Sequence, residues 1–198
     1  RTGGSIVSAQ KVGPAVAADM AKGAIISVIL SLIAIFVYIL ARFRNVAFSI
    51  GSVLALTVDT LIIVGMYSIC WGWMPFSLEV DQTFIGAVLT AIGYSINDKV
   101  VVFDRIRENL GLYPKRETER LFNDSLNETL ARTIMTSATT LLVLLCIFFL
   151  GGDSIRSFAF AMILGVIFGT LSSIFLAAPI AFRTLGKKRV VEAAVAKA

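Results

Sequence analysis

The sequence predicts an all-α integral membrane protein, a bundle of five transmembrane helices. Hydrophobic residues make up 57% of the 198 residues and charged residues only 16%, with a mean hydropathy of +0.86. Soluble domains are typically near half apolar with about a quarter of their residues charged. The apolar residues gather in long runs, and lipid cannot satisfy open strand edges, so helices are the expected state. This composition excludes a disordered chain, and two cysteines are too few for a disulfide scaffold.

Five apolar segments are long enough, at 1.5 Å per residue, to cross roughly 30 Å of hydrocarbon, although the fourth is at the short limit. The predicted spans are 22–41, 46–70, 84–103, 134–150 and 157–182. They divide the chain into an extracytoplasmic remnant at 1–20, a membrane domain at 21–186 with a cytoplasmic loop at 104–133, and a basic cytoplasmic tail at 187–198.

The distribution of basic residues predicts the orientation of the bundle. Thirteen Lys and Arg residues follow spans one, three and five, whereas four lie on the other side. Cytoplasmic loops carry the excess of basic residues, so we expect the N-terminus outside and the C-terminus inside. The segment 71–83 then lies outside, where Trp71 and Trp73 fit an aromatic belt at the membrane interface.

The predicted cytoplasmic loop contains a short amphipathic segment at 115–129. Leu121, Phe122 and Leu126 follow helical spacing and give this segment one apolar stripe. We expect a separate helix lying along the membrane surface, and the alternative is a docking site for a cytoplasmic partner.

Charged residues inside the apolar spans are the candidates for function. Asp59 lies in the second span, and Asn97, Asp98 and Lys99 lie in the third. A charge at the bilayer centre costs about 2.5–3.5 kcal/mol on insertion scales, so such residues indicate an ion or proton pathway. The alternative is a pair of buried carboxylates that only lock helices together. Lys99 is near the cytoplasmic boundary, where we expect it to snorkel to the headgroups rather than pair with an aspartate.

Helical spacing arranges polar and small residues into stripes. One stripe on the third span, flanked by Tyr94 and Asp98, contains Gly86, Thr90, Gly93 and Asn97. The fourth span opens with Arg132, which either points into the bundle or anchors the span at the headgroups, followed by Thr133, Thr136, Ser137 and Thr140.

The fifth span carries small residues every four positions, the pattern that lets helices approach closely in membranes. The stripe consists of Ala161, Gly165, Gly169, Ser173 and Ala177. Pro179 is expected to kink or loosen the last turns, because proline cannot donate a helical hydrogen bond. The turn at 151–156 makes spans four and five antiparallel neighbours.

Several strings together resemble the SecF branch of the SecD/SecF protein-export family, in the resistance-nodulation-division superfamily. They are ALTVD (55–59), GYSINDKVVVFDRIRENL (93–110), SLNETLARTIMTSATTLL (125–142), FLGGDSIRSFA (149–159) and GTLSSIFLAAP (169–179). The sequence departs from the family pattern at Val58, where histidine is expected, and at Lys99, where a small hydroxyl residue is expected.

The resemblance implies the membrane half of a proton-driven machine in the bacterial cytoplasmic (inner) membrane. The family assists SecYEG-dependent protein translocation with the proton motive force, so the implied partners are SecD or a SecD half of the same polypeptide, SecYEG, the translocating preprotein and membrane lipid. The matching positions make Asp98 and Arg132 the functional pair, with Asp59 and Asn97 on the same proton pathway. Two alternatives remain, namely half of a proton-driven small-molecule exporter and a passive assembly scaffold for the translocon.

The sequence predicts neither an enzyme nor a nucleic-acid-binding protein. It has no histidine, the commonest metal ligand, so we expect no metal site and no cofactor other than the proton as coupling ion.

Overall fold

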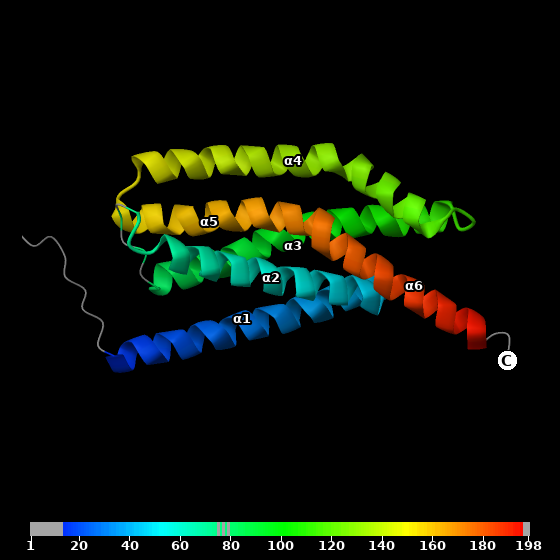
Figure 1. The fold of residues 1–198 in the computed structure, drawn as a ribbon, viewed down its shortest axis with the longest axis horizontal. Coiled ribbons are helices and arrows are strands. Elements are labelled where there is room, and N and C mark those ends of the chain that lie inside the picture. Colours follow the sequence, from blue (N-terminus) through cyan, green and yellow to red (C-terminus); the bar gives the residue numbers. More distant parts are fainter. Residues whose placement is uncertain (1–13, 75, 77, 79, 196–198) are drawn as a thin grey trace, which may run out of the picture.

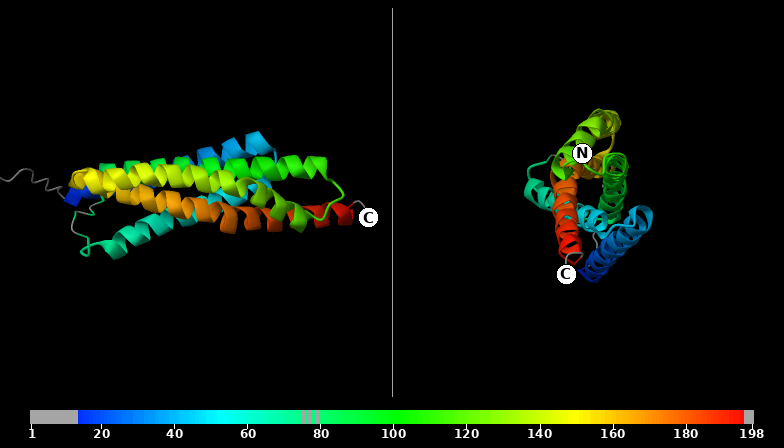
Figure 2. Two further views of the ribbon diagram at one scale, coloured as in Figure 1. Left: turned by 90° about the horizontal axis from the view of Figure 1, so that it is seen from above. Right: turned by 90° about the vertical axis from the view of Figure 1, so that its right-hand side faces the viewer.

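The computed structural model describes residues 14–74, 76, 78 and 80–195, which form a bundle of long helices running roughly along one axis (Figures 1 and 2). The helices are α1 (Pro14–Phe43), α2 (Val46–Cys70), α3 (Gln82–Leu112), α4 (Thr118–Leu150), α5 (Asp153–Ser172), the π-helix η1 (Ser173–Ala177) and α6 (Ala178–Val195). Five stretches in the described residues are long and apolar enough to cross a membrane, with α5, η1 and α6 together making the fifth. The predicted all-α fold with five spans is confirmed.

The helices extend well beyond the predicted apolar spans. Only residues 113–117 separate α3 from α4, so most of the segment 104–133 is helical. The expectation of a separate surface helix at 115–129 is wrong, because α4 contains no glycine or proline and continues unbroken from Thr118. Its first turns are not solvated on all sides: Leu121 and Phe122 are buried, and the Phe122 ring packs on Phe182 at 5.4 Å between centroids.

The fifth span is interrupted where the proline predicts it. Pro179 has no N–H to donate to the carbonyl group four residues earlier, and the helix widens into the π-helix η1 just before it. The chain then continues as α6 to Val195, so most of the predicted basic tail at 187–198 is helical. At the other end of the bundle, Gly151 and Gly152 join α4 and α5 as antiparallel neighbours.

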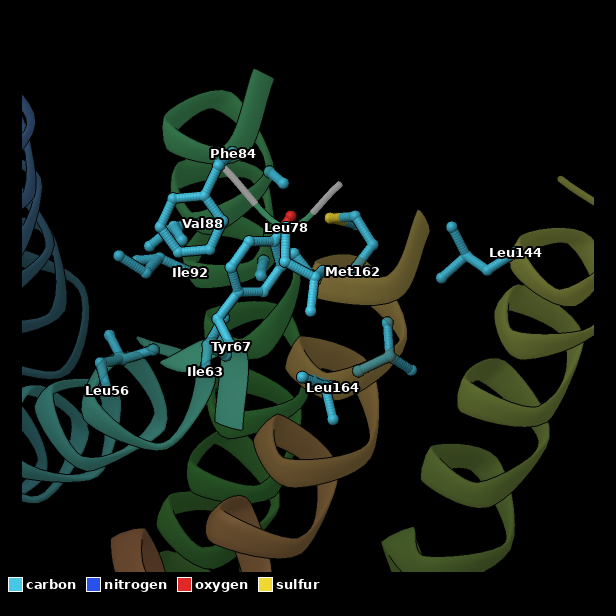
Figure 3. Close-up of a cluster of buried hydrophobic side chains, with 14 of the residues drawn as sticks. Leu56, Ile63, Tyr67, Leu78, Phe84, Val88, Ile92, Leu144, Met162 and Leu164 are labelled. Carbon is cyan, nitrogen blue, oxygen red and sulfur yellow. The ribbon is translucent and has the colours of Figure 1, made fainter. Parts of the chain in front are cut away.

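The bundle has two apolar cores, one toward each end. The first lies among α2, α3 and α5, where the rings of Tyr67 and Phe84 stand 4.2 Å apart between centroids (Figure 3). The second lies near the α3–α4 connection and includes Phe48, Phe103 and residues of α6. Helix α1 lies at the edge of the bundle beside α2 (Figure 1), and its apolar side chains are mostly exposed, as expected for a helix that faces lipid. On α3, Asp98 and Lys99 lie between the residues of the two cores.

Candidate functional site

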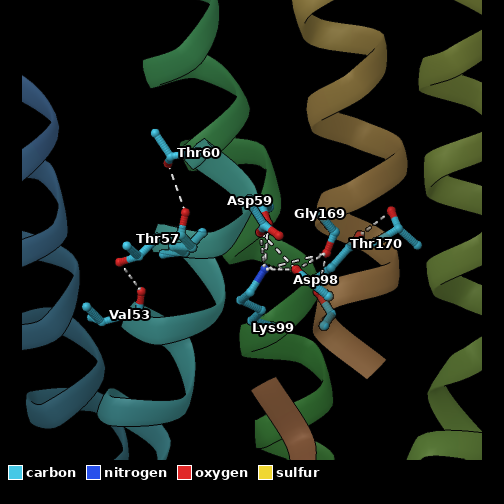
Figure 4. A network of polar contacts seen from close by, with 12 residues as sticks. Val53, Thr57, Asp59, Thr60, Asp98, Lys99, Gly169 and Thr170 are labelled. Atoms are coloured by element: carbon cyan, nitrogen blue, oxygen red, sulfur yellow. Dashed lines mark hydrogen bonds and ion pairs between the residues drawn. The ribbon is translucent and has the colours of Figure 1, made fainter. Parts of the chain in front are cut away.

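Asp59 lies in the middle of α2 and points toward α3 and α5 (Figure 4). Only 2% of the residue is exposed. Its Oδ2 accepts hydrogen bonds from Ser95 Oγ at 2.8 Å and Ser172 Oγ at 2.8 Å, and from the Lys99 ammonium at 3.0 Å. One carboxylate oxygen therefore joins three helices.

Lys99 is completely buried, and the expectation that it snorkels to the headgroups is wrong. Its ammonium forms an ion pair with Asp59 and donates to Ser95 Oγ at 2.5 Å and Ser172 Oγ at 2.9 Å. A buried charge requires a partner and satisfied hydrogen bonds, and the face of α3 that carries Lys99 offers both. Pairing with an aspartate, the alternative considered from the sequence, is the arrangement found.

Asp98 belongs to a second network on a different side of α3. The residue is 3% exposed, and its Oδ2 accepts a hydrogen bond from Thr170 Oγ1 at 3.3 Å. The Thr170 hydroxyl also pairs with Ser137 Oγ at 2.6 Å, which continues the chain of hydroxyl groups to α4. Asp98 and Lys99 are neighbours in sequence, and both reach α5, but they use different hydroxyl groups, Thr170 for Asp98 and Ser172 for Lys99.

The predicted polar stripe of α3 lies on the outside of this chain. Gly86, Thr90, Gly93 and Asn97 are all exposed, and we call these four residues the polar face. At its edge, the Tyr94 hydroxyl donates to the Thr136 carbonyl group at 3.1 Å and contacts Thr140 Oγ1 at 3.2 Å, which joins α3 to the polar turns of α4. Asp98, at the same edge as Tyr94, is buried.

Arg132 is exposed on α4, and no ion pair joins it to Asp98 within the described part of the chain. The charges of Arg132 and Lys99 act on the Asp98 carboxylate through space. The structure therefore brings Asp98 and Asn97 to one region of α3, leaves Arg132 nearby without contact, and separates Asp59 from them in its own network.

Gly165 and Gly169 of the small-residue stripe pack closely against α3. A Cβ atom on Gly165 would overlap Ala91 Cβ, and one on Gly169 would lie 2.7 Å from Ser95 Oγ. Ala161 is fully buried, and Ser173 Oγ donates back to the Gly169 carbonyl group of its own helix at 2.8 Å. The close approach lets side chains of α3 reach the backbone of α5.

Sequence reasoning missed three residues of these networks: Ser95, Thr170 and Ser172. Ser95 stands one helical turn before Lys99, a spacing that puts both side chains on one face. Nothing in the spacing of Thr170 or Ser172 separates them from the other hydroxyl residues of the spans. Among the described residues, no group of three or more acidic, cysteine or histidine side chains could hold a metal ion.

The arrangement offers groups that can hold and pass on a proton. It combines a buried carboxylate, a chain of hydroxyl groups that can donate or accept, and an exposed polar face at membrane depth. Intramembrane carboxylates in such settings commonly mark ion or proton pathways.

Comparison with known proteins places this geometry in a family. Residues 2–187 match the family described as protein export membrane protein SecD/SecF, C-terminal. The chain is 52% identical over 175 residues to the protein translocase subunit SecF of Rhodothermus marinus, covering 88% of this chain and 56% of that protein. It is 39% identical over 192 residues to the protein translocase subunit SecDF of Thermus thermophilus, covering 97% of this chain and 25% of that protein.

A solved structure of SecDF in a super-membrane-facing form has the same fold. The two superpose with a TM-score of 0.77 at 39% sequence identity, and the matched region covers 92% of this chain and 23% of the SecDF chain. The chain thus spans about half the length of the curated SecF relatives it matches. The resemblance to SecF is confirmed, and the chain belongs to the SecD/SecF protein-export membrane protein family, of which it is a C-terminal membrane portion.

Proposed function

We propose that this chain is the C-terminal membrane part of a SecF subunit that assists SecYEG-dependent protein translocation across the bacterial inner membrane, using the proton motive force. Its relatives are translocase subunits by name. In Thermus thermophilus the matching segment is part of a single SecDF polypeptide, which supports SecD as the partner of this chain.

The observation that carries the proposal is Asp98. It is a buried carboxylate at the edge of the polar face, with a hydroxyl chain leading from Thr170 to α4. A polar, small-residue surface at membrane depth is costly against lipid, so the polar face supports a contact with the SecD half. Protons then reach Asp98 at the boundary between the two halves.

The free energy released when one proton crosses the membrane is similar to the free-energy difference between two ways of packing helices. A charge that crosses 100 mV releases about 2.3 kcal/mol, and each pH unit adds about 1.36 kcal/mol per proton. This is enough to shift an equilibrium between two packings that differ by a few kcal/mol, but not enough to unfold a domain. Ionised Asp98 attracts a cation such as Arg132 or a group of SecD, and protonation releases that cation. The resulting movement of helices is passed to the part of the protein that holds the preprotein.

The distribution of basic residues supports an orientation in which α1 begins outside and the α3–α4 connection is cytoplasmic. The exposed apolar side chains of α1 are suited to contact with lipid.

The test is Asp98→Asn in the full-length protein with its SecD partner. This change keeps size and hydrogen bonding but removes titration, so protein import into inverted membrane vesicles should lose the part stimulated by an imposed proton gradient. The matched control is Asp104→Asn on the same helix, where the carboxylate is half exposed and pairs with Arg42 at 3.2 Å. This control should keep the full gradient response.

Three outcomes separate the candidate functions. Loss of gradient stimulation with normal assembly supports the proposal. Loss of the complex itself supports a scaffold in which Asp98 only locks helices. A full gradient response in Asp98→Asn means that Asp98 is structural and that the proton mechanism proposed for it is wrong.

A further inference from the structure

The Lys99 ammonium is enclosed by oxygen atoms from three helices (Figure 4). We call the four acceptors the oxygen cage: Asp59 Oδ2 at 3.0 Å, Ser95 Oγ at 2.5 Å, Ser172 Oγ at 2.9 Å and the Gly169 carbonyl oxygen at 3.5 Å. One acceptor carries a formal negative charge, and the other three are neutral.

The composition of the cage is that of a binding site for a hard monovalent cation. Such cations take carboxylate, hydroxyl and carbonyl oxygens as ligands, and the cage offers all three types. A single carboxylate balances one positive charge, whereas a divalent ion would leave a buried charge uncompensated. The ammonium satisfies the same electrostatic requirement as a free ion would.

Two further features show that the cage is built into the packing. Gly169 has no side chain, and a Cβ atom there would lie 2.7 Å from Ser95 Oγ, so the carbonyl group approaches only because this residue is glycine. The second oxygen of Asp59, Oδ1, is buried and has no hydrogen-bond partner among the described residues. It is a spare ligand beside the ammonium, in a residue that is 2% exposed.

We propose that Lys99 is a tethered cation: its amine permanently fills a monovalent-cation site formed by the oxygen cage. Asp59 is then held as the partner of a fixed charge, in a network separate from the one around Asp98. The amine also excludes free alkali ions from the membrane interior beside Asp98. When the amine is removed, the cage takes up a free cation in its place.

The experiment measures the thermal stability of the full-length protein, purified in detergent, carrying Lys99→Ala. The midpoint of unfolding, Tm, is compared in ammonium, potassium, sodium and choline chloride at one ionic strength. Choline is too large to enter the cage. At a cation concentration about ten times the dissociation constant, Tm of the full-length protein should rise by roughly 2 °C above its value in choline. The unmodified protein should show the same Tm in all four salts.

Two variants control for the charge and the space. The double variant Asp59→Asn, Lys99→Ala keeps the void but lacks the carboxylate, and it should lose the difference between small cations and choline. Lys99→Met fills the void with an apolar chain and should also show no difference. These outcomes do not depend on protein export, so they are independent of the proposed function.

The inference is overturned if Lys99→Ala is folded and has the same Tm in all four salts. Lys99→Ser provides a second variant with a polar side chain in the cage. If neither variant yields folded protein in any of the four salts, a free cation cannot replace the amine, and the inference fails as well. A rise in Tm that persists in the double variant would assign the effect to another site and would equally refute it.

Discussion

Replacing Gly165 with alanine tests how closely α5 must approach α3. A Cβ atom at this position would overlap Ala91 Cβ and lie 3.4 Å from Ile63 Cδ1. Ala91 and Ile63 are themselves buried, so neither can move into open space. The helices must separate, and overpacking of this kind typically costs about 1–3 kcal/mol.

The matched control is Gly65→Ala on α2, where nothing lies within 4 Å of the added atom. Alanine is favoured over glycine in a helix interior by roughly 0.5–1 kcal/mol, and both variants gain this term. The difference between the two variants therefore isolates the clash. It should be about 1–3 kcal/mol, or roughly 1–4 °C in Tm for a full-length protein about twice as long as this chain.

The assay is the apparent Tm of each purified full-length variant in the same detergent. Gly165→Ala should melt below the unmodified protein, and Gly65→Ala should melt at or above it. Equal Tm values for the two variants would show that α5 does not depend on close contact with α3, and the packing argument for the small-residue stripe would then be refuted.

Two further predictions concern charge and orientation. Arg132→Met should assemble normally yet lose gradient-stimulated translocation, because the buried carboxylate then lacks its nearby counter-charge; an unchanged gradient response would make Arg132 a simple headgroup anchor. In a background with Cys70 and Cys146 replaced, a cysteine at Glu117 should react with an impermeant thiol reagent from the cytoplasmic side and one at Val80 from the outside, and the reverse pattern would contradict the proposed orientation.

The sequence was sufficient for the number and approximate positions of the helices. Apolar runs of 17 residues or more have few other stable states in lipid, so length and hydropathy together specify a bundle. The ends of the helices were less predictable, because α4 begins in a polar segment whose only apolar stripe is covered by α6. This packing depends on a contact between Phe122 and Phe182, two residues that are more than fifty positions apart in the sequence.

The site was predictable in its charged residues but not in their pairing. Asp59, Asp98 and Lys99 are conspicuous in apolar surroundings, and each is buried. Which carboxylate takes the amine depends on how α3 is rotated against α2 and α5, and a sequence pattern does not give that rotation. Snorkelling is common for lysines near a boundary, but here an ion pair and three further acceptors within 3.5 Å outweigh it.

The π-helix η1 changes the direction in which the small-residue stripe of the fifth span faces. Small residues recur every four positions from Ala161 through the fifth span, but a step of four residues in an α-helix advances by about 40° beyond a full turn. A long stripe of this period would spiral away from its neighbours. The π-helix at 173–177 takes up one extra residue, equal to about 100° of rotation, and so resets the spiral.

On the two sides of this change, the small residues pack against different helices, first α3 and then α2. Before η1 the small residues Gly165 and Gly169 meet α3, whereas Ala177 at the end of η1 and Ala181 in α6 meet α2 at Gly51, where a Cβ atom would lie 2.8 Å from the Ala177 carbonyl oxygen. The continuous segment formed by α5, η1 and α6 thus packs closely against both α3 and α2, which lie on different sides of it. A change in the winding of η1 would therefore rotate α6 about its axis relative to α2, without requiring a change in the contact between α5 and α3.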